Sequence, residues 1–156
     1  MRSGVGELRA GGLDDPQVAA LIARHLAEAR GATPADHAHA LGAEALRAPD
    51  VSLWTMWDGA GLLGIGALRQ IDPAHGEIKS MRTAPGHLRR GVARAMLAHL
   101  VALARARGYA RISLETGTAP MFDAANRLYE TSGFVDGPPF GGYPPSPHNR
   151  FMTMAL

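Results

Sequence analysis

The sequence predicts an α/β (α+β) protein built on one mixed, mostly antiparallel sheet of 6–7 strands with about four flanking helices. Residues 51–57 alternate β-branched and aromatic side chains, and residues 62–69 form the return strand after an Asp-Gly turn. A second reversal at residues 72–76 leads into a strand that begins at Glu77 and extends the antiparallel meander. A long helix separates this strand from the next one, at residues 110–115, and such a connection favours a parallel pair.

The N-terminal part is predicted to hold one strand, at residues 5–10, and two helices. Asp15 suits the N-cap of the first helix, because Pro16 follows at the first helical position, where its missing N–H is tolerated. Residues 33–36 repeat this capping pattern for a second helix that runs through Leu46. The buried stripe of the first helix is expected to comprise Val18, Leu21, Ile22 and Leu26.

The most regular helical pattern of the chain begins after Gly91. Apolar residues recur there at helical spacing, so one face of this helix is expected to be buried. Gly108 supplies a C-terminal stop, and Arg105 and Arg107 suit the negative end of the helix dipole. The stripe comprises Val92, Met96, Leu97, Leu100, Val101, Leu103 and Ala104.

The start of the same helix is predicted to bind a pyrophosphate. The first N–H groups of a helix have no partner within it, and the helix dipole favours negative charge there. Gly91 and Ala93 keep the entry free of bulk. The guanidinium groups of Arg89, Arg90 and Arg94 can chelate phosphate oxygens. The alternative is an ordinary amphipathic helix with solvated arginines, and neither familiar glycine-rich nucleotide motif is present.

The C-terminal part is predicted to hold one more helix, at residues 121–132, which Pro120 opens. Asn126 and Tyr129 lie three residues apart and therefore share a face of this helix. The remaining expectations are core contacts at Phe122 and Leu128, a strand at Phe134 and Val135, a proline-rich loop at residues 137–147 and a closing strand at residues 150–156.

Three motifs follow one another along this pattern. They are Glu-Ile-Lys-Ser-Met-Arg-Thr at residues 77–83, Arg-Arg-Gly-Val-Ala at residues 89–93, and Asn-Arg-Leu-Tyr-Glu at residues 126–130, which runs into Ser-Gly-Phe at residues 132–134. In this order they resemble the GNAT superfamily of acetyl-CoA-dependent N-acetyltransferases. The resemblance implies a single GNAT domain over residues 1–156, with acetyl-CoA as co-substrate and no metal. It also implies that the two parallel strands splay apart and that the pantetheine arm of the coenzyme fills the gap.

The resemblance assigns residues to the coenzyme as well. The family's phosphate loop usually begins with Gln or Arg, whereas this chain has Leu88, so Arg89 or Arg90 would serve the phosphates. Backbone groups at Met81 and Thr83 would bind the pantetheine arm, and an amide near Met81 or Arg82, freed by a bulge in this strand, could donate to the thioester oxygen. The expected coenzyme-binding residues are Met81, Arg82, Thr83, Arg89, Arg90, Gly91, Val92, Ala93, Arg94 and Asn126.

Attack of an amine on a thioester needs a neutral amine, donors for the oxyanion and a proton for the departing thiolate. Tyr129 is expected to protonate the thiolate, with a role as a core aromatic as the alternative. Glu77 and Glu115 are the candidate general bases, with Glu77 slightly favoured and solvated strand-end carboxylates as the alternative. Tyr143 and His148 are further candidates as acceptor contacts. Because the chain has no cysteine to carry an acyl group, direct transfer in a ternary complex is implied.

Composition limits the partners. Lysine and arginine number 16 and aspartate and glutamate 14, for a net charge of +2, so a nucleic-acid partner is not implied. No apolar run approaches the roughly 20 residues that span a bilayer. A cytoplasmic enzyme with no membrane partner is therefore the default expectation. His37 and His39 would lie on opposite faces of a helix, so we expect no metal site there.

The acceptor is expected to be an amine of a small molecule or a peptide, and Arg69, Arg82 and Arg150 are candidates to hold a carboxylate on it. The alternative is a catalytically inactive regulatory or ligand-binding module that binds coenzyme A. A nucleic-acid binder is disfavoured, because the apolar stripe occupies one face of the arginine-rich helix. The terminal strand could pair across a homodimer.

Overall fold

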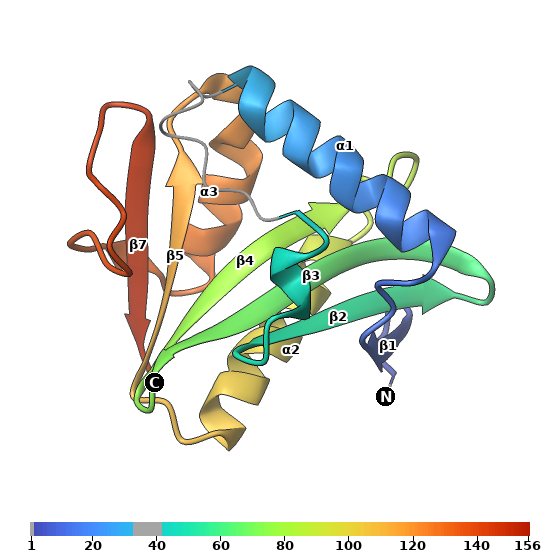
Figure 1. Cartoon of the computed structure of the whole chain (residues 1–156), viewed down its shortest axis with the longest axis horizontal. Helices are drawn as coiled ribbons and strands as arrows, with labels where there is room; N and C mark the ends of the chain where they lie inside the picture. Colours follow the sequence, from blue (N-terminus) through green and yellow to red (C-terminus); the bar gives the residue numbers. More distant parts are fainter. Residues whose placement is uncertain (1, 33–41) are drawn as a thin grey trace.

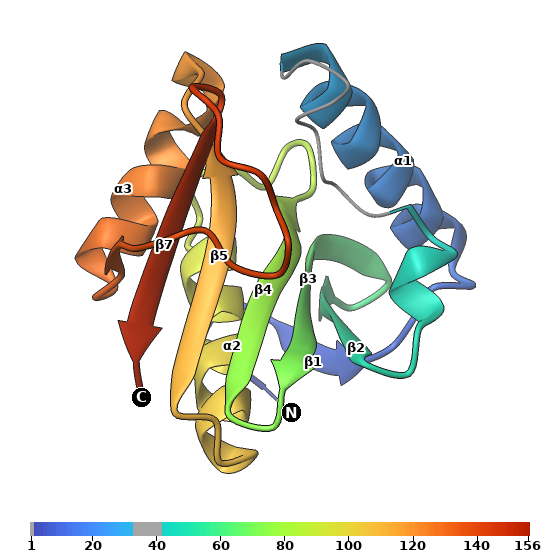
Figure 2. The ribbon, with the colours of Figure 1, turned by 60° about the vertical axis from the view of Figure 1, so that its left-hand side comes forward.

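The computed structural model describes residues 2–32 and 42–156, which form a seven-stranded sheet with helices on both faces (Figures 1 and 2). This architecture confirms the predicted mixed α/β class. The strands are β1 (Glu7–Ala10), β2 (Val51–Asp58), β3 (Gly61–Asp72), β4 (His75–Thr83), β5 (Arg111–Gly117), β6 (Val135–Asp136) and β7 (Asn149–Ala155). The helices are α1 (Pro16–Ala32), α2 (Val92–Ala106) and α3 (Asp123–Thr131), with short 3₁₀ turns η2 (Ala45–Arg47) and η3 (Pro120–Phe122).

The strands follow the order β1-β2-β3-β4-β5-β7-β6, and β4 with β5 is the parallel pair within an otherwise antiparallel sheet. The two parallel strands are paired only over residues 75–78 and 111–114. Because β4 continues to Thr83 and β5 to Gly117, the strands separate beyond Ile78 and Leu114 (Figure 1). The predicted splayed pair is therefore present.

The helices cover opposite faces of the sheet (Figure 2). Residues of α2 and α3 pack in one buried cluster, and residues of α1 pack in another on the opposite face. Trp54 packs against the first cluster, with its ring 4.2 Å from that of His99, whereas Trp57 belongs to the second. The two tryptophans thus face opposite sides, as their odd sequence separation predicted.

Local signals account for the ends of the helices. The Asp15 carboxylate accepts a hydrogen bond from the backbone N–H of Gln17 at 2.8 Å, which is the predicted N-cap of α1. Gly108 follows α2 with φ of +79°, a left-handed conformation that glycine adopts without strain. The stripe of α2 is buried as expected, except that Leu103 is only half-buried.

A bulge interrupts β4 where the sequence led us to expect one. Ile65 pairs with Arg82 and Ala67 pairs with Lys79, so β4 holds one more residue than β3 in this interval. Ser80, inside the bulge, has φ of +55°. The bulge lies directly after the point at which β4 leaves β5.

The second N-terminal helix is the main difference from the prediction. Its expected start at residues 33–36, together with His37 and His39, lies outside the described residues. In the described part, only the 3₁₀ turn η2 follows, which buries Leu46. Residues 2–32 and 42–156 therefore contain three α-helices, against the expected four or so.

The helix predicted at residues 121–132 begins later in the structure, and of its expected core contacts Leu128 packs against the cluster on the α2 face. Its first turn is the 3₁₀ turn η3, so α3 begins only at Asp123. Asn126 and Tyr129 are the buried residues of α3, whereas Phe122 and Leu128 are half-buried. Two α-helical residues three apart share a face, and here that face meets the sheet.

The C-terminal strand β7 has neighbours on both sides within the chain. β7 pairs along its whole length with β5, and β6 pairs with its other edge at Met152 and Thr153. The second edge of β7 is thus paired over part of its length, and the suggested pairing across a homodimer stays a prediction.

Candidate active site

A cavity of about 710 Å³ opens where β4 and β5 separate. Residues of α1, β4, the start of α2, the end of β5, η3, α3 and the loop before β7 form its walls. Most of the sequence-predicted site residues line this one cavity, although they come from distant parts of the chain. They are Glu77, Met81, Arg82, Thr83, Arg89, Gly91, Val92, Ala93, Arg94, Glu115 and Tyr129. The predicted residues Arg90 and Asn126 are not part of the lining.

One end of the cavity is the N-terminus of α2. Gly91 is the N-cap with φ of +80°, and no side chain caps this end of the helix. Arg89 also has a positive φ, of +62°, and an alternation of left- and right-handed residues turns successive N–H groups toward one side, as in anion-binding nests. Within the described residues, the guanidinium groups of Arg89, Arg90 and Arg94 have no carboxylate partner within 4 Å. This end can therefore receive a phosphate group.

Asn126 is not part of the cavity lining, although its hydrogen-bond partners Thr116 and Gly117 are. Its amide Nδ2 donates to the Gly117 carbonyl at 3.0 Å, and its Oδ1 accepts from the Thr116 hydroxyl at 2.7 Å. Both hydrogen bonds fix α3 to the end of β5. The predicted contact of Asn126 with the coenzyme stays a prediction.

Tyr129 projects from α3 into the wall of the cavity. Its ring is buried and packs against Phe134, with ring centroids 6.0 Å apart. Burial raises the pKa of the Tyr129 hydroxyl to about 12, so the group keeps its proton at neutral pH. None of the described residues hydrogen-bonds this hydroxyl, which leaves it available to a bound molecule.

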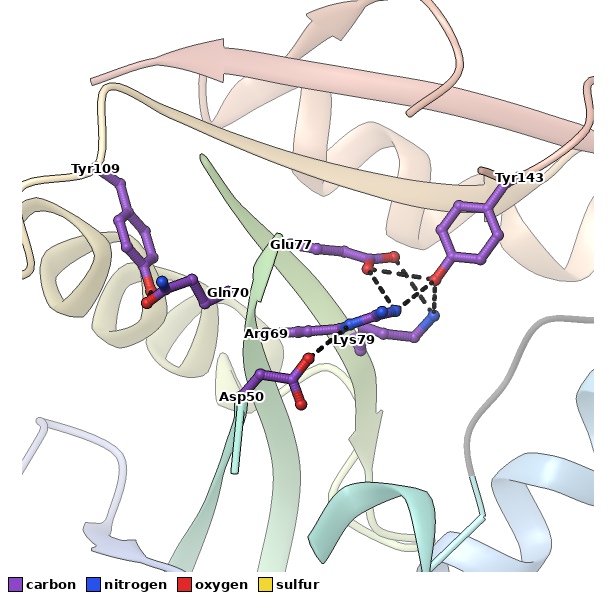
Figure 3. Close-up of polar contacts among 7 residues, drawn as sticks. All are labelled: Asp50, Arg69, Gln70, Glu77, Lys79, Tyr109 and Tyr143. Atoms are coloured by element: carbon purple, nitrogen blue, oxygen red, sulfur yellow. Dashed lines mark hydrogen bonds and ion pairs between the residues drawn. The ribbon is translucent and has the colours of Figure 1, made fainter. Parts of the chain in front are cut away.

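Glu77 is almost completely buried, with 1% of its side chain exposed, and it lies in a network of polar groups (Figure 3). Lys79 Nζ lies 3.3 Å from Glu77 Oε2, and the Tyr143 hydroxyl donates to Oε1 at 3.2 Å. Arg69 Nη1 lies 3.7 Å from Oε1 and is also bound to Asp50 through its Nε at 3.3 Å. Both oxygens of the Glu77 carboxylate thus face donors from within the chain.

Tyr143 brings the loop before β7 into this network. Lys79 Nζ donates to the Tyr143 hydroxyl at 2.6 Å and lies 4.8 Å from the centre of its ring. Burial and the neighbouring Glu77 carboxylate raise the pKa of Tyr143. The neutral phenol therefore bridges Lys79 and Glu77, and the loop is fixed across β4 on the face that α1 covers (Figure 2).

Glu115 stands on β5 beside the same opening. Its side chain lines the cavity and is half-buried, and its Oε2 accepts a hydrogen bond from Asn149 Nδ2 at 2.6 Å. Leu114 packs in the cluster on the α2 face, so Glu115 points to the opposite face, as Glu77 does beside Ile78. The two carboxylates therefore lie on the same face of the sheet, opposite to α2, and both line the cavity.

The α1 wall of the cavity carries an ion pair between Glu28 and Arg82. Arg24 also reaches Glu28, with Nε and Oε1 3.1 Å apart. Burial acts to raise the pKa of Glu28, but the two arginines outweigh it and lower the pKa. Next to this pair, burial and the charge of Arg82 lower the pKa of His25 to about 4, so its ring is neutral at physiological pH.

Of the three arginines considered for an acceptor carboxylate, only Arg82 lines the cavity. Arg69 belongs to the Glu77 network. Arg150 makes a two-pronged hydrogen bond to Asp136, with distances of 2.7 and 3.2 Å, and a third bond to Glu130 at 2.9 Å.

Several residues of the site escaped the sequence analysis. Lys79 lies two residues after Glu77, so the period of a strand puts both side chains on one face, and this signal was available. The pairing of Arg82 with Glu28 and the burial of Ser80 depend on contacts between distant segments, for which the sequence holds no local signal.

Two further findings concern metal binding and membrane spans. In residues 2–32 and 42–156, no three His, Cys, Asp or Glu side chains are grouped so that they could hold a metal ion. The helices in those ranges are all too short or too polar to cross a membrane.

The fold and the cavity together define a class of protein. A helix N-terminus without a side-chain cap, a gap between two parallel strands and a cavity lined by a buried tyrosine and two carboxylates fit an acyltransferase that uses a coenzyme A thioester. The family model described as Acetyltransferase (GNAT) family matches residues 19–134. The chain therefore belongs to the GNAT family, and the prediction of an acetyltransferase is confirmed at this level.

Two bacterial relatives that align with most of the chain support this assignment. The uncharacterised N-acetyltransferase YedL of Escherichia coli is 46% identical over 144 residues, which are 92% of this chain and 91% of YedL. The uncharacterised N-acetyltransferase YsnE of Bacillus subtilis is 46% identical over 140 residues, which are 90% of this chain and 93% of YsnE.

Solved structures agree with the fold. A protein from Klebsiella pneumoniae assigned to the acyl-CoA N-acyltransferases superposes with a TM-score of 0.79 at 25% identity, and 99% of each chain is covered. A GNAT family acetyltransferase from Elizabethkingia anophelis, solved with acetyl-CoA bound, superposes with a TM-score of 0.71 at 16% identity over 99% of this chain and 100% of that one.

Proposed function

We propose that this GNAT protein, acting as one domain, transfers the acetyl group of acetyl-CoA directly to an amine of a small molecule or a peptide. The observation that carries the proposal is the single cavity that connects the N-terminus of α2 with Tyr129 and Glu115 through the gap between β4 and β5. Such a cavity fits an elongated thioester with a diphosphate at one end and its reactive carbonyl at the other.

The diphosphate would lie against the N–H groups at Gly91, Val92 and Ala93. Gly91 turns the chain into α2, and Arg89 and Arg94, which have no carboxylate partner among the described residues, would contact phosphate oxygens. The backbone of Met81 and Thr83 faces the gap beyond the last β4–β5 pair and would bind the pantetheine arm as a strand neighbour would.

Glu115 is the better candidate for the general base, in place of the slightly favoured Glu77. Both oxygens of Glu77 face Lys79, Tyr143 or Arg69 in a buried network, whereas the half-buried Glu115 lines the cavity at the end of β5. The Glu77 carboxylate is therefore occupied by donors of the chain itself and is 1% exposed, which leaves it less accessible to an acceptor amine. Glu77 would instead maintain the shape and charge of the acceptor side.

Tyr129 would give its proton to the thiolate of coenzyme A as the carbon–sulfur bond breaks. Its hydroxyl is neutral at physiological pH and lines the cavity, which suits a proton donor to a leaving group. A backbone N–H in the bulge near Met81 would stabilise the oxyanion that precedes this step.

The test is a panel of amines incubated with the purified protein and acetyl-CoA, with release of the free thiol of coenzyme A as the readout. Because Arg82 lines the acceptor side, the panel should contain amino acids beside the corresponding amines that lack a carboxylate. Amine-dependent thiol release with a matching acetylated product is the expected result. Tight binding of coenzyme A without transfer to any amine or peptide would contradict the proposed activity.

A further inference from the structure

Ser80 is the one buried hydroxyl in the described part of the chain that has no hydrogen-bond partner. The residue is 9% exposed and lines the cavity of about 710 Å³. A buried hydroxyl without a partner has lost its hydrogen bonds to water and gained none in return, which is unfavourable. In native proteins such groups are rare, and each requires an explanation.

Ser80 is also in an unfavourable backbone conformation. Within residues 2–32 and 42–156, only Ser80 and Arg89 are non-glycine residues with positive φ, at +55° and +62°. Both residues line the same cavity. Non-glycine residues held in this region cost free energy and gather at active sites, because the surrounding structure must impose the conformation.

The position of Ser80 in the sheet suits a reactive group. It is in the bulge of β4, two residues after Ile78, where the pairing with β5 ends. The following residues, Met81 and Arg82, also line the cavity. Ser80 therefore belongs to the stretch of β4 that borders the gap between the two parallel strands.

Other buried hydroxyls of the sheet differ from Ser80 in this respect. Ser113 on β5 is 2% exposed and does not line the cavity, and its Oγ lies 2.6 Å from His75 Nε2 and 2.9 Å from Thr153 Oγ1. Thr55 is 1% exposed and is bound by Trp57 Nε1 at 2.8 Å. The missing partner of Ser80 is thus a local property of the cavity wall, not a general feature of this sheet.

We propose that Ser80 is a further catalytic residue, whose hydroxyl donates a hydrogen bond to the acyl oxygen of acetyl-CoA, together with a backbone N–H of the bulge. The proposal rests on the proposed acetyl transfer. A donor that is buried, unpaired and fixed by the backbone before the substrate binds needs little reorganisation when charge develops on that oxygen.

The step is balanced without any further reactant. The amine nitrogen forms a bond to the acyl carbon, and the electron pair of the C=O bond moves to the oxygen, which Ser80 stabilises without losing its own proton. The C=O bond then re-forms as the carbon–sulfur bond breaks. The thiolate takes the proton of Tyr129, and the proton of the amine passes to Glu115.

The variant Ser80→Ala removes the donor and leaves the backbone unchanged. Loss of one oxyanion donor lowers kcat by roughly 10²–10³-fold in the best-studied case, and because a backbone N–H remains we expect a fall in kcat of about 10- to 100-fold. The KM of the amine and the Kd of coenzyme A should stay within about twofold, because the hydrogen bond strengthens only as charge develops. The Tm should stay the same or rise, because the hydroxyl has no partner to lose.

Ser113→Ala is the matched control. It removes a buried hydroxyl that has two partners, so its Tm should fall while kcat stays within about threefold. If Ser80→Ala keeps kcat within threefold, or lowers kcat only together with a fall in Tm like that of Ser113→Ala, the proposal is wrong. A rise in the KM of the amine with unchanged kcat would also overturn it.

Infrared spectroscopy gives a readout that does not need turnover. With acetyl-CoA labelled with ¹³C at the carbonyl and bound without an amine, the C=O stretch should lie at lower frequency in the wild-type protein than in Ser80→Ala. An identical frequency in both proteins would refute the contact, even if no amine is ever acetylated. A wild-type protein that transfers no acetyl group but shows the frequency difference would contradict the proposed activity and leave the hydrogen bond established.

Discussion

Glu77→Gln removes a negative charge on which three donor side chains converge. Lys79, Arg69 and Tyr143 all approach this carboxylate, and 1% of the Glu77 side chain and 6% of the Lys79 side chain are exposed. Glutamine has nearly the same shape and keeps one oxygen that can accept a hydrogen bond, so the change isolates the effect of charge. The matched variant is Glu115→Gln, which alters the half-buried carboxylate across the gap.

The magnitude follows from burial. Removing one partner of a buried ion pair costs about 3–5 kcal/mol, and the retained oxygen of glutamine places Glu77→Gln near the lower value, at about 3 kcal/mol. For a domain of this size, that free energy corresponds to a fall in Tm of roughly 6–12 °C. Glu115→Gln keeps an oxygen for the Asn149 amide and should cost about 1 kcal/mol or less.

The rates should show the opposite order. Loss of a general base lowers the rate by about 10²–10⁴-fold, so Glu115→Gln should lower kcat at neutral pH by about 100-fold or more. Glu77→Gln, measured well below its Tm, should lower kcat by less than about tenfold. Thermal unfolding and steady-state kinetics on the same preparations provide the comparison.

The reverse result would refute this reasoning. If Glu77→Gln retains the wild-type Tm but loses activity about 100-fold, while Glu115→Gln remains active, Glu77 is the base and its contacts with Lys79 and Tyr143 do not prevent proton transfer.

Three further variants test other parts of the site. Tyr129→Phe should lower kcat by about 100-fold and leave the Kd of coenzyme A within about twofold. The Tm should stay unchanged, because no described residue binds the hydroxyl. Equal losses in kcat and in affinity for coenzyme A would indicate a packing role. Gly91→Val should weaken coenzyme A binding at least about tenfold. Gly108→Val, at a similar φ of +79° at the other end of α2, should cost similar stability without changing that affinity. Equal affinities of the two variants for coenzyme A would contradict the phosphate site. The pKa of His25 falls from 6.5 to about 4 on folding, so the unfolded chain binds a proton first as the pH drops. The free energy of unfolding should therefore decrease between pH 6.5 and pH 4 by up to about 3 kcal/mol. Urea unfolding at several pH values should show a smaller decrease for His25→Gln, and the same decrease in both proteins would refute the assignment.

The β4–α2–β5 unit could be predicted because its signals are local. Residues close together in the sequence indicate the apolar stripe of α2, the glycines at its two ends and the parallel crossover. The bounds shifted by a few residues, since β4 begins at His75 and leaves a tighter turn than the expected one at residues 72–76.

The role of Asn126 could not be read from its helix face. The shared face of Asn126 and Tyr129 was correct, but two hydrogen bonds join the Asn126 amide to β5, and Asn126 does not line the cavity. A helical period says which residues are neighbours on a helix and not which of them reaches a ligand.

The contacts around Glu77 depend on a loop whose path has no periodic signal. Tyr143 lies 66 residues from Glu77 in the sequence and is preceded by two glycines with positive φ, at +61° and +78°. Glycine in this region permits many paths, so its sequence does not specify which strand the tyrosine meets. For the same reason Tyr143 could be proposed only as an acceptor contact and not as a partner of Glu77.

A crystal structure with coenzyme A bound would test the central claim most directly. We expect the diphosphate oxygens within hydrogen-bond distance of the backbone N–H groups at residues 91–93, with Arg89 or Arg94 in contact, and the sulfur between β4 and β5 near Tyr129. A diphosphate bound elsewhere, with the protein's own side chains filling the start of α2, would contradict it.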